Sequence, residues 1–252
     1  TVGGGGLMQA TILGLALNDI PDPTIESQLE PNTYPAIDAT AYQRLDGTTI
    51  YAGTAAANVD RERDRIYVME DSIHVEAREQ TVEETVACEW IADLEAGWVG
   101  VDTADGDWLF EALGGQKGTP ILEATIDVDG FAEHLQDYPR SSAWNVTQSR
   151  SLDEDDDAEE SVIAYHDAAH LSDTTGSRTT TMLGFRYEWD GTRVRGTIAE
   201  SGYVALFEGG DRPGTYAAWL NSQVLPFAEL PEEYQGHLGA SATDQEVSAD
   251  VE

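Results

Sequence analysis

Lysine and cysteine are almost absent from this chain of 252 residues. Of its 13 basic residues, Lys117 is the single lysine, and the others are arginines. Cys88 is the single cysteine, which excludes an intramolecular disulfide framework and any zinc finger built on cysteines. It lies in an alternating apolar stretch, so we predict a buried structural thiol. No apolar run reaches the length of about 18 residues that a membrane-spanning helix needs, so we expect no membrane span.

Acidic residues dominate the composition. The chain has 48 Asp and Glu residues and a formal net charge of −35. Such a charge destabilises a compact fold by self-repulsion at low salt, whereas in molar salt the Debye length falls to about 3 Å. The composition resembles that of proteins from halophilic archaea that keep molar salt in the cytoplasm. This resemblance implies a cytoplasmic protein of a halophilic archaeon, or of its virus or mobile element, that requires high salt. It implies no activity.

The pattern of apolar residues predicts an α+β fold, with one or more mainly antiparallel, meandering β-sheets and a few short covering helices. A buried opening strand is expected over 8–20. Alternating segments joined by tight turns predict hairpins, with Asp46-Gly47 and Asp190-Gly191 expected to form type I′ turns. The expected hairpin regions are 41–55, 64–79, 84–103 and 180–210.

Three helices are expected between or after these strands. The first should be capped by Asp105 and stopped by Gly114, and the second should be capped by Asp129 and end before Pro139. The third is an amphipathic helix over 214–230, whose apolar face consists of Tyr216, Trp219, Leu220 and Val224.

A weak internal repeat suggests two related halves. The turn sequence Glu95–Val99 has a similar counterpart 105 residues later in Glu200–Val204, and a Trp-Leu pair follows each turn. A duplication would give two pseudo-symmetric halves, 8–118 and 119–230, each with a meander and a helix. The alternative is two independent hairpins that use a common glycine turn.

The two ends of the chain are expected to lie outside these halves. Residues 1–7, with four glycines, have the sequence of a cloning remnant before Met8. This end has neither basic residues nor a clear cleavage site, so we expect no signal peptide. Residues 231–252 have the composition of a polar acidic tail.

One short motif suggests a metal site. His166, Asp167 and His170 form H-D-x-x-H, which differs from the zinc-peptidase signature H-E-x-x-H by one methylene. That chemistry needs both histidines on one face of a stable helix, whereas the flanking sequences predict strand and turn. We therefore interpret the motif as a loop of ordinary polar residues and keep a metal-dependent hydrolase as an alternative. The acidic run 151–160 has no calcium-loop spacing. No cofactor-binding motif is present, and no cofactor is expected.

The scarce arginines form two alternating groups that should each share one strand face. These are Arg61, Arg63 and Arg65, and a second pair, Arg193 and Arg195, near Arg186. Such groups suggest contacts with nucleic acid or an acidic partner. The alternative is that each arginine neutralises an adjacent carboxylate, as the alternation in "DRERDR" favours. We predict a non-enzymatic binding or assembly protein with a protein partner or self-assembly, and a nucleic-acid-associated protein as the alternative.

Overall fold

The computed structural model describes residues 10–44, 46–68, 73–138, 140–149, 163–165 and 179–235, with the backbone alone for 62–68, 73–80, 149, 163–165 and 235. Within these ranges eleven strands form one antiparallel sheet in the order β2-β3-β4-β5-β1-β12-β11-β10-β8-β9, and β6 also pairs with β1. The predicted α+β class with a mainly antiparallel meandering sheet is confirmed. The strands are β1 Ala10–Ala16, β2 Ala36–Gln43, β3 Thr49–Val68, β4 Ile73–Asp93, β5 Trp98–Val101, β6 Ile121–Glu123, β8 Ser142–Ser149, β9 Ile163–Tyr165, β10 Thr179–Trp189, β11 Thr192–Ala199 and β12 Tyr203–Glu208.

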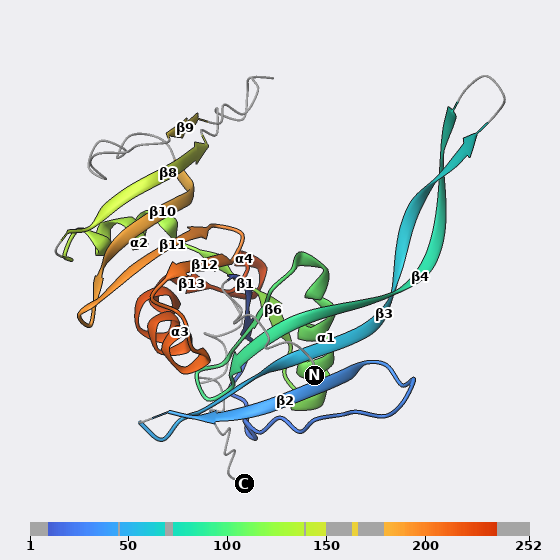
Figure 1. The fold of residues 1–252 in the computed structure, drawn as a ribbon, viewed down its shortest axis with the longest axis horizontal. Helices are drawn as coiled ribbons and strands as arrows, with labels where there is room; N and C mark the ends of the chain where they lie inside the picture. The colour runs from blue at the N-terminus through green and yellow to red at the C-terminus, as the bar shows by residue number, and fades with distance from the viewer. Residues whose placement is uncertain are drawn as a thin grey trace, which may run out of the picture.

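Strand β1 joins the two parts of the sheet (Figure 1). On one side it pairs with β5, and on the other it pairs with β12 and then with β6. Strands from 8–118 and from 119–230 therefore share one continuous sheet. Strands β5 and β12, which follow the two similar turns of the predicted repeat, are the two neighbours of β1.

Helices cover both faces of the sheet, and each face has its own apolar core. The helical elements are η1 Ala104–Gly106, α1 Trp108–Lys117, α2 Val128–Leu135, α3 Pro213–Trp219, a π-helical turn Leu220–Val224, η4 Leu225–Phe227 and α4 Glu232–Gln235. The larger core joins α2 and α3 to β10, β11 and β12, and the smaller one joins α1 to the strands of the first half. Neighbouring residues of β1 contribute to opposite cores, Leu13 to the larger and Ile12 to the smaller, because side chains alternate along a strand.

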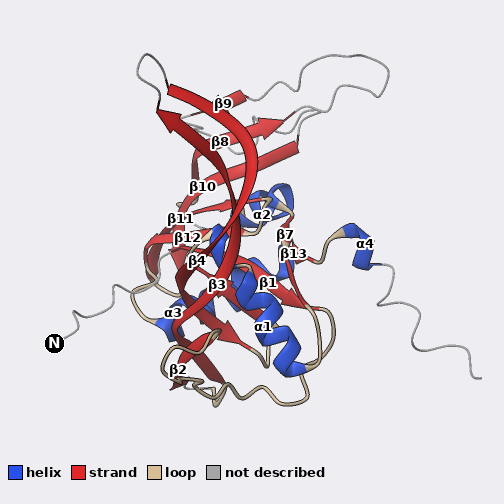
Figure 2. Cartoon of the chain, turned by 90° about the vertical axis from the view of Figure 1, so that its right-hand side faces the viewer, coloured by secondary structure: helices blue, strands red, loops and turns tan. Residues whose placement is uncertain are grey.

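The β3–β4 hairpin is much longer than the rest of the sheet. Its pairing runs from Tyr51↔Ala92 to Val68↔Ile73, and its outer part projects from the body of the protein (Figures 1 and 2). The predicted hairpin over 64–79 is the end of this arm, although the expected turn at Asp71-Ser72 lies outside the described residues.

The predicted helix caps were wrong by a few residues. Asp107, not Asp105, caps α1, and its carboxylate accepts a hydrogen bond from Trp108 N. The helix ends at Gly118, whose φ of 70° suits glycine. Asp127, not Asp129, caps α2 by accepting from Gly130 N. In each case two aspartates separated by one residue made the capping residue ambiguous.

Gly114 lies inside α1 instead of ending it. A Cβ atom added there would be 2.9 Å from Thr119 O, so the glycine allows the chain after α1 to pack against the helix.

The meander over 180–210 is confirmed as β10, β11 and β12, and the Asp190-Gly191 turn has positive φ at both residues, as a type I′ turn requires. At the β2–β3 turn only Gly47 has positive φ, and Asp46 instead accepts hydrogen bonds from Thr48, so a type I′ turn was the wrong prediction there.

Residues 120–128 hold two short strands, β6 and β7, Thr125–Ile126, and β7 pairs with β13, Ala228–Glu229. The helix expected over 214–230 is interrupted by the π-helical turn, but the four residues of its predicted apolar face are all buried.

Within the described residues no helix is long and apolar enough to cross a membrane.

Candidate functional site

The structure leaves the metal hypothesis without support in the part of the chain that it describes. His166, Asp167 and His170 lie outside the described residues, as does the acidic run 151–160. Among the residues that are described, no group of three or more His, Cys, Asp or Glu side chains could hold a metal ion. Cys88 is buried, and burial, with a smaller effect of the Asp102 charge, raises the pKa of its thiol to about 12. The thiol is therefore no nucleophile near neutral pH.

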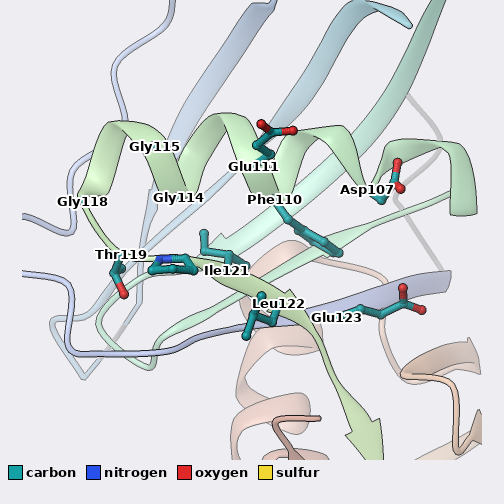
Figure 3. Close-up of a pocket in the computed structure, with 11 residues that line it drawn as sticks. Asp107, Phe110, Glu111, Gly114, Gly115, Gly118, Thr119, Ile121, Leu122 and Glu123 are labelled. Carbon is teal, nitrogen blue, oxygen red and sulfur yellow. The ribbon is translucent and has the colours of Figure 1, made fainter. Parts of the chain in front are cut away.

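An apolar pocket of about 590 Å³ lies between α1 and β6. Figure 3 shows Phe110 pointing from the helix toward the strand, with Asp107 and Glu123 at one end of the pocket. Burial, and to a lesser extent the Asp107 charge, raises the pKa of the Glu123 carboxyl. Its lining includes no histidine, cysteine, lysine or arginine. The pocket therefore offers an apolar surface with carboxylates at its edge.

In the first predicted arginine group, the side chain of Arg61 is described, and carboxylates of the fold hold it. On β3, Arg61 forms an ion pair with Asp105 at 2.7 Å and lies 3.8 Å from Glu84. Carboxylates thus neutralise Arg61, but these two lie far from it in the sequence and are not the adjacent acids that the alternation suggested. A register shift separates Arg63 from Arg65, and their side chains lie outside the described part of the structure. Strands β4, β5, β1 and β12 separate β3 from the strand that holds Arg193 and Arg195.

The second predicted group does come together with Arg186. In the β10–β11 ladder Arg186 lies directly opposite Arg195, and Glu188 lies opposite Arg193. The intervening residues Tyr187 and Val194 point the other way, into the larger core. Two like charges placed opposite each other in a sheet are destabilising, so other contacts must offset this pair.

Two aromatic side chains supply those contacts. The Arg195 guanidinium lies over the Trp144 ring, 4.8 Å from its centroid, and 6.0 Å from the Phe207 centroid. The Trp144 and Phe207 rings are 6.1 Å apart. Trp144 donates a hydrogen bond from Nε1 to Phe185 O, which fixes the indole. We call the surface formed by Trp144, Arg186, Arg193, Arg195 and Phe207 the arginine face.

A β-bulge places each aromatic residue on this face. In β8 two residues, Asn145 and Val146, oppose the single Leu183, and Asn145 has φ of 51°. Trp144 therefore faces Gly184, where a Cβ would be 2.7 Å from the indole ring.

The second bulge leaves Phe207 without a residue opposite it on β11, between Arg195↔Glu208 and Gly196↔Leu206. The Phe207 side chain is 45% exposed. Bulges often redirect side chains at binding sites.

The guanidinium groups of this face have unused donors. The Nε atoms of Arg186 and Arg195 are buried and have no hydrogen-bond partner among the described residues. A buried N–H without an acceptor costs free energy, by about 1–3 kcal/mol in proteins. Because these two Nε atoms are buried, a ligand at this face would bind the other guanidinium nitrogens.

A pocket of about 470 Å³ adjoins Arg186 at the end of the arginine face. Arg140 and Arg193 also line it, together with the Ser142 hydroxyl and Glu188. Two of these arginines form ion pairs, Arg140 with Glu188 at 3.7 Å and Arg193 with Glu208 at 3.4 Å. Both ion pairs are exposed to solvent, so each contributes little to stability. Four of the chain's few arginines thus lie around one surface.

Sequence reasoning found the arginines of this face but missed Trp144 and Phe207. The alternation rule places a residue on a face from its spacing, and each bulge shifts that spacing by one residue. The positive φ of Asn145 agrees with the tolerance of asparagine for left-handed backbone, which is the only sequence signal of either bulge.

No protein-family model matches the chain, and the search of curated proteins found no significant match.

Proposed function

We propose that this chain is a non-enzymatic binding protein that contacts an anionic partner through the arginine face. The observation behind the proposal is the Arg186–Arg195 pair, because two arginines lie directly opposite each other on neighbouring strands. An anionic ligand bound beside them would offset the repulsion between their charges. We further propose that it acts in the molar salt of a halophilic cytoplasm, as its charge of −35 suggests.

The long β3–β4 arm also favours a role in association. A two-stranded hairpin is marginally stable by itself in water, and the outer part of this arm projects beyond the covering helices. At its base, Asn58 and Thr85 form a cross-strand hydrogen bond, and Asn58 also donates to Glu83. Beyond this point contact with a partner chain would stabilise the ribbon.

Retention on two immobilised anionic polymers, polyglutamate and heparin, tests the proposal without assuming the class of partner. In about 1 M KCl, where screening removes most non-specific attraction, the unaltered protein should be retained on at least one. The Arg186→Gln/Arg195→Gln double variant should elute earlier, and the control Arg212→Gln, which removes an exposed charge at the start of α3, should not. Failure of the unaltered protein to bind either polymer, or equal retention of the double variant, would contradict the proposal.

A further inference from the structure

We infer that the anionic partner of the arginine face is single-stranded nucleic acid, with phosphate bound in the Arg140–Arg186–Arg193 pocket and a base stacked on Phe207 and Arg195. This inference rests on the proposed function and names the class of its ligand. It depends on three features of the described residues: the donors, the aromatic surface and the position of both on one surface of the sheet.

The donors fit a phosphodiester. The pocket of about 470 Å³ is lined by Arg140, Arg186, Arg193 and Ser142, together with Glu188. Guanidinium groups bind phosphate through paired N–H donors, and the hydroxyl can donate to a further phosphate oxygen. The Nε atom of Arg186 is buried, so a phosphate in the pocket would have to accept from the terminal nitrogens of this guanidinium.

Glu188 and Glu208 restrict what can bind. Both carboxylates stand beside arginines of this face, Glu188 near Arg140 and Glu208 near Arg193. A continuous run of carboxylates, as in an acidic polypeptide, would bring its charges close to both glutamates. A single phosphate in the pocket meets one carboxylate, that of Glu188, against three arginines.

The aromatic surface fits a base better than an acidic side chain. Phe207 is 45% exposed, and the Arg195 guanidinium lies beside its ring on top of Trp144. Bases stack on aromatic rings and on guanidinium planes whatever their sequence. A carboxylate has no such surface, so an acidic protein segment would leave Phe207 unused.

The position of these residues on a sheet surface favours a single strand over a duplex. The arginine face is the surface of β8, β10, β11 and β12, and the helices α2 and α3 pack against the opposite face of these strands. A duplex keeps its bases stacked inside and offers a sheet little beyond its phosphates. A single strand can turn its bases onto the sheet, as in other sheet-based readers of single-stranded RNA.

Salt conditions make the stacking contact decisive. Each phosphate contact of a single strand adds a slope of about −0.7 to the dependence of log affinity on log salt concentration. In molar KCl that contribution is small, whereas base stacking persists. The ligand that this face can hold in concentrated salt is therefore one with a planar ring beside its phosphate.

Fluorescence anisotropy of a labelled thymidine dodecamer tests the inference, in about 0.5 M and about 2 M KCl. Phe207→Ala should weaken binding about tenfold at both salt concentrations, because it removes one stacking contact. Arg186→Gln should weaken binding more at the lower concentration, because it removes a phosphate contact. The control Arg212→Gln should bind like the unaltered protein. Circular dichroism of each variant checks that the fold is kept.

The outcomes separate this inference from the proposed function. If the dodecamer does not bind, or if Phe207→Ala and Arg186→Gln bind it as tightly as the unaltered protein does, the inference is wrong. If duplex DNA of the same length binds as tightly as the single strand, it is also wrong. In either case retention on polyglutamate that depends on Arg186 and Arg195 would leave an acidic protein as the partner. Loss of that retention as well would overturn both proposals.

Discussion

Arg186 and Arg195 lie directly opposite each other on β10 and β11, with the Arg195 guanidinium 4.8 Å from the centroid of the Trp144 ring. In a chain with 48 acidic residues, the expected partner of an arginine is a carboxylate, as Arg61 has in Asp105. Arg186 and Arg195 instead face each other and an indole. The cation–π contact contributes roughly 0.5–2 kcal/mol, which offsets part of the repulsion between the two charges. The rest is a cost that an anionic ligand would remove.

Stability should rise with salt concentration. The net charge of −35 repels itself at low ionic strength, and screening in about 2 M KCl removes most of that repulsion. We expect the midpoint of thermal unfolding to be higher in about 2 M than in about 0.1 M KCl, by on the order of 10 °C or more. Equal midpoints at the two concentrations would contradict the halophilic interpretation, and a parallel series in sucrose, which acts without screening, serves as the control.

Cys88 should be unreactive in the folded protein. Burial raises the pKa of its thiol to about 12, so almost none is thiolate near pH 8, and the side chain is 3% exposed. Ellman's reagent should therefore label no thiol in the native protein and one thiol per chain after denaturation. Rapid labelling of the native protein would show that the β3–β4 region around Cys88 opens readily.

Trp219 should contribute more to stability than Trp108. The Trp219 Nε1 atom donates to the Tyr187 hydroxyl at 2.7 Å, and that hydroxyl donates to Gln223 Oε1 at 3.2 Å, all within the larger core. Trp219→Phe should lower the free energy of unfolding by about 2–4 kcal/mol, because it leaves a buried hydroxyl without one partner and a small cavity.

The matched change Trp108→Phe removes an indole N–H that is buried and has no acceptor in the described part of the chain. It should cost much less. Chemical denaturation in molar KCl gives both values, and equal losses would show that the Trp219–Tyr187 hydrogen bond adds nothing beyond packing.

Much of the fold could be predicted from the sequence, because alternation along a strand and the residues of a tight turn are local sequence features. The meander of β10, β11 and β12 follows from alternation and two glycine turns, and the buried face of α3 follows from helical spacing. The order of strands around β1 could not be predicted, because pairing between β1 and β12 joins residues far apart in sequence. The internal repeat stays a hypothesis; the place of β5 and β12 beside β1 agrees with it.

The site was only half predictable. Spacing alone puts Arg193 and Arg195 on one face, but not Trp144 and Phe207, because each depends on one extra residue in its strand. Whether an arginine is free or neutralised also depends on tertiary contacts. Asp105, which pairs with Arg61, lies in η1 after β5, and nothing in the sequence near Arg61 indicates it.

The most direct test of the arginine face is to observe the Nε–Hε groups of the arginines by nuclear magnetic resonance while a thymidine dodecamer is added. The Nε atoms of Arg186 and Arg195 have no acceptor in the described structure, whereas Arg61 is held by Asp105. We predict that the signals of Arg186 and Arg195 shift on binding and that the signal of Arg61 stays in place. A shift of the Arg61 signal with Arg186 and Arg195 unchanged, or no shift at all, would contradict the account.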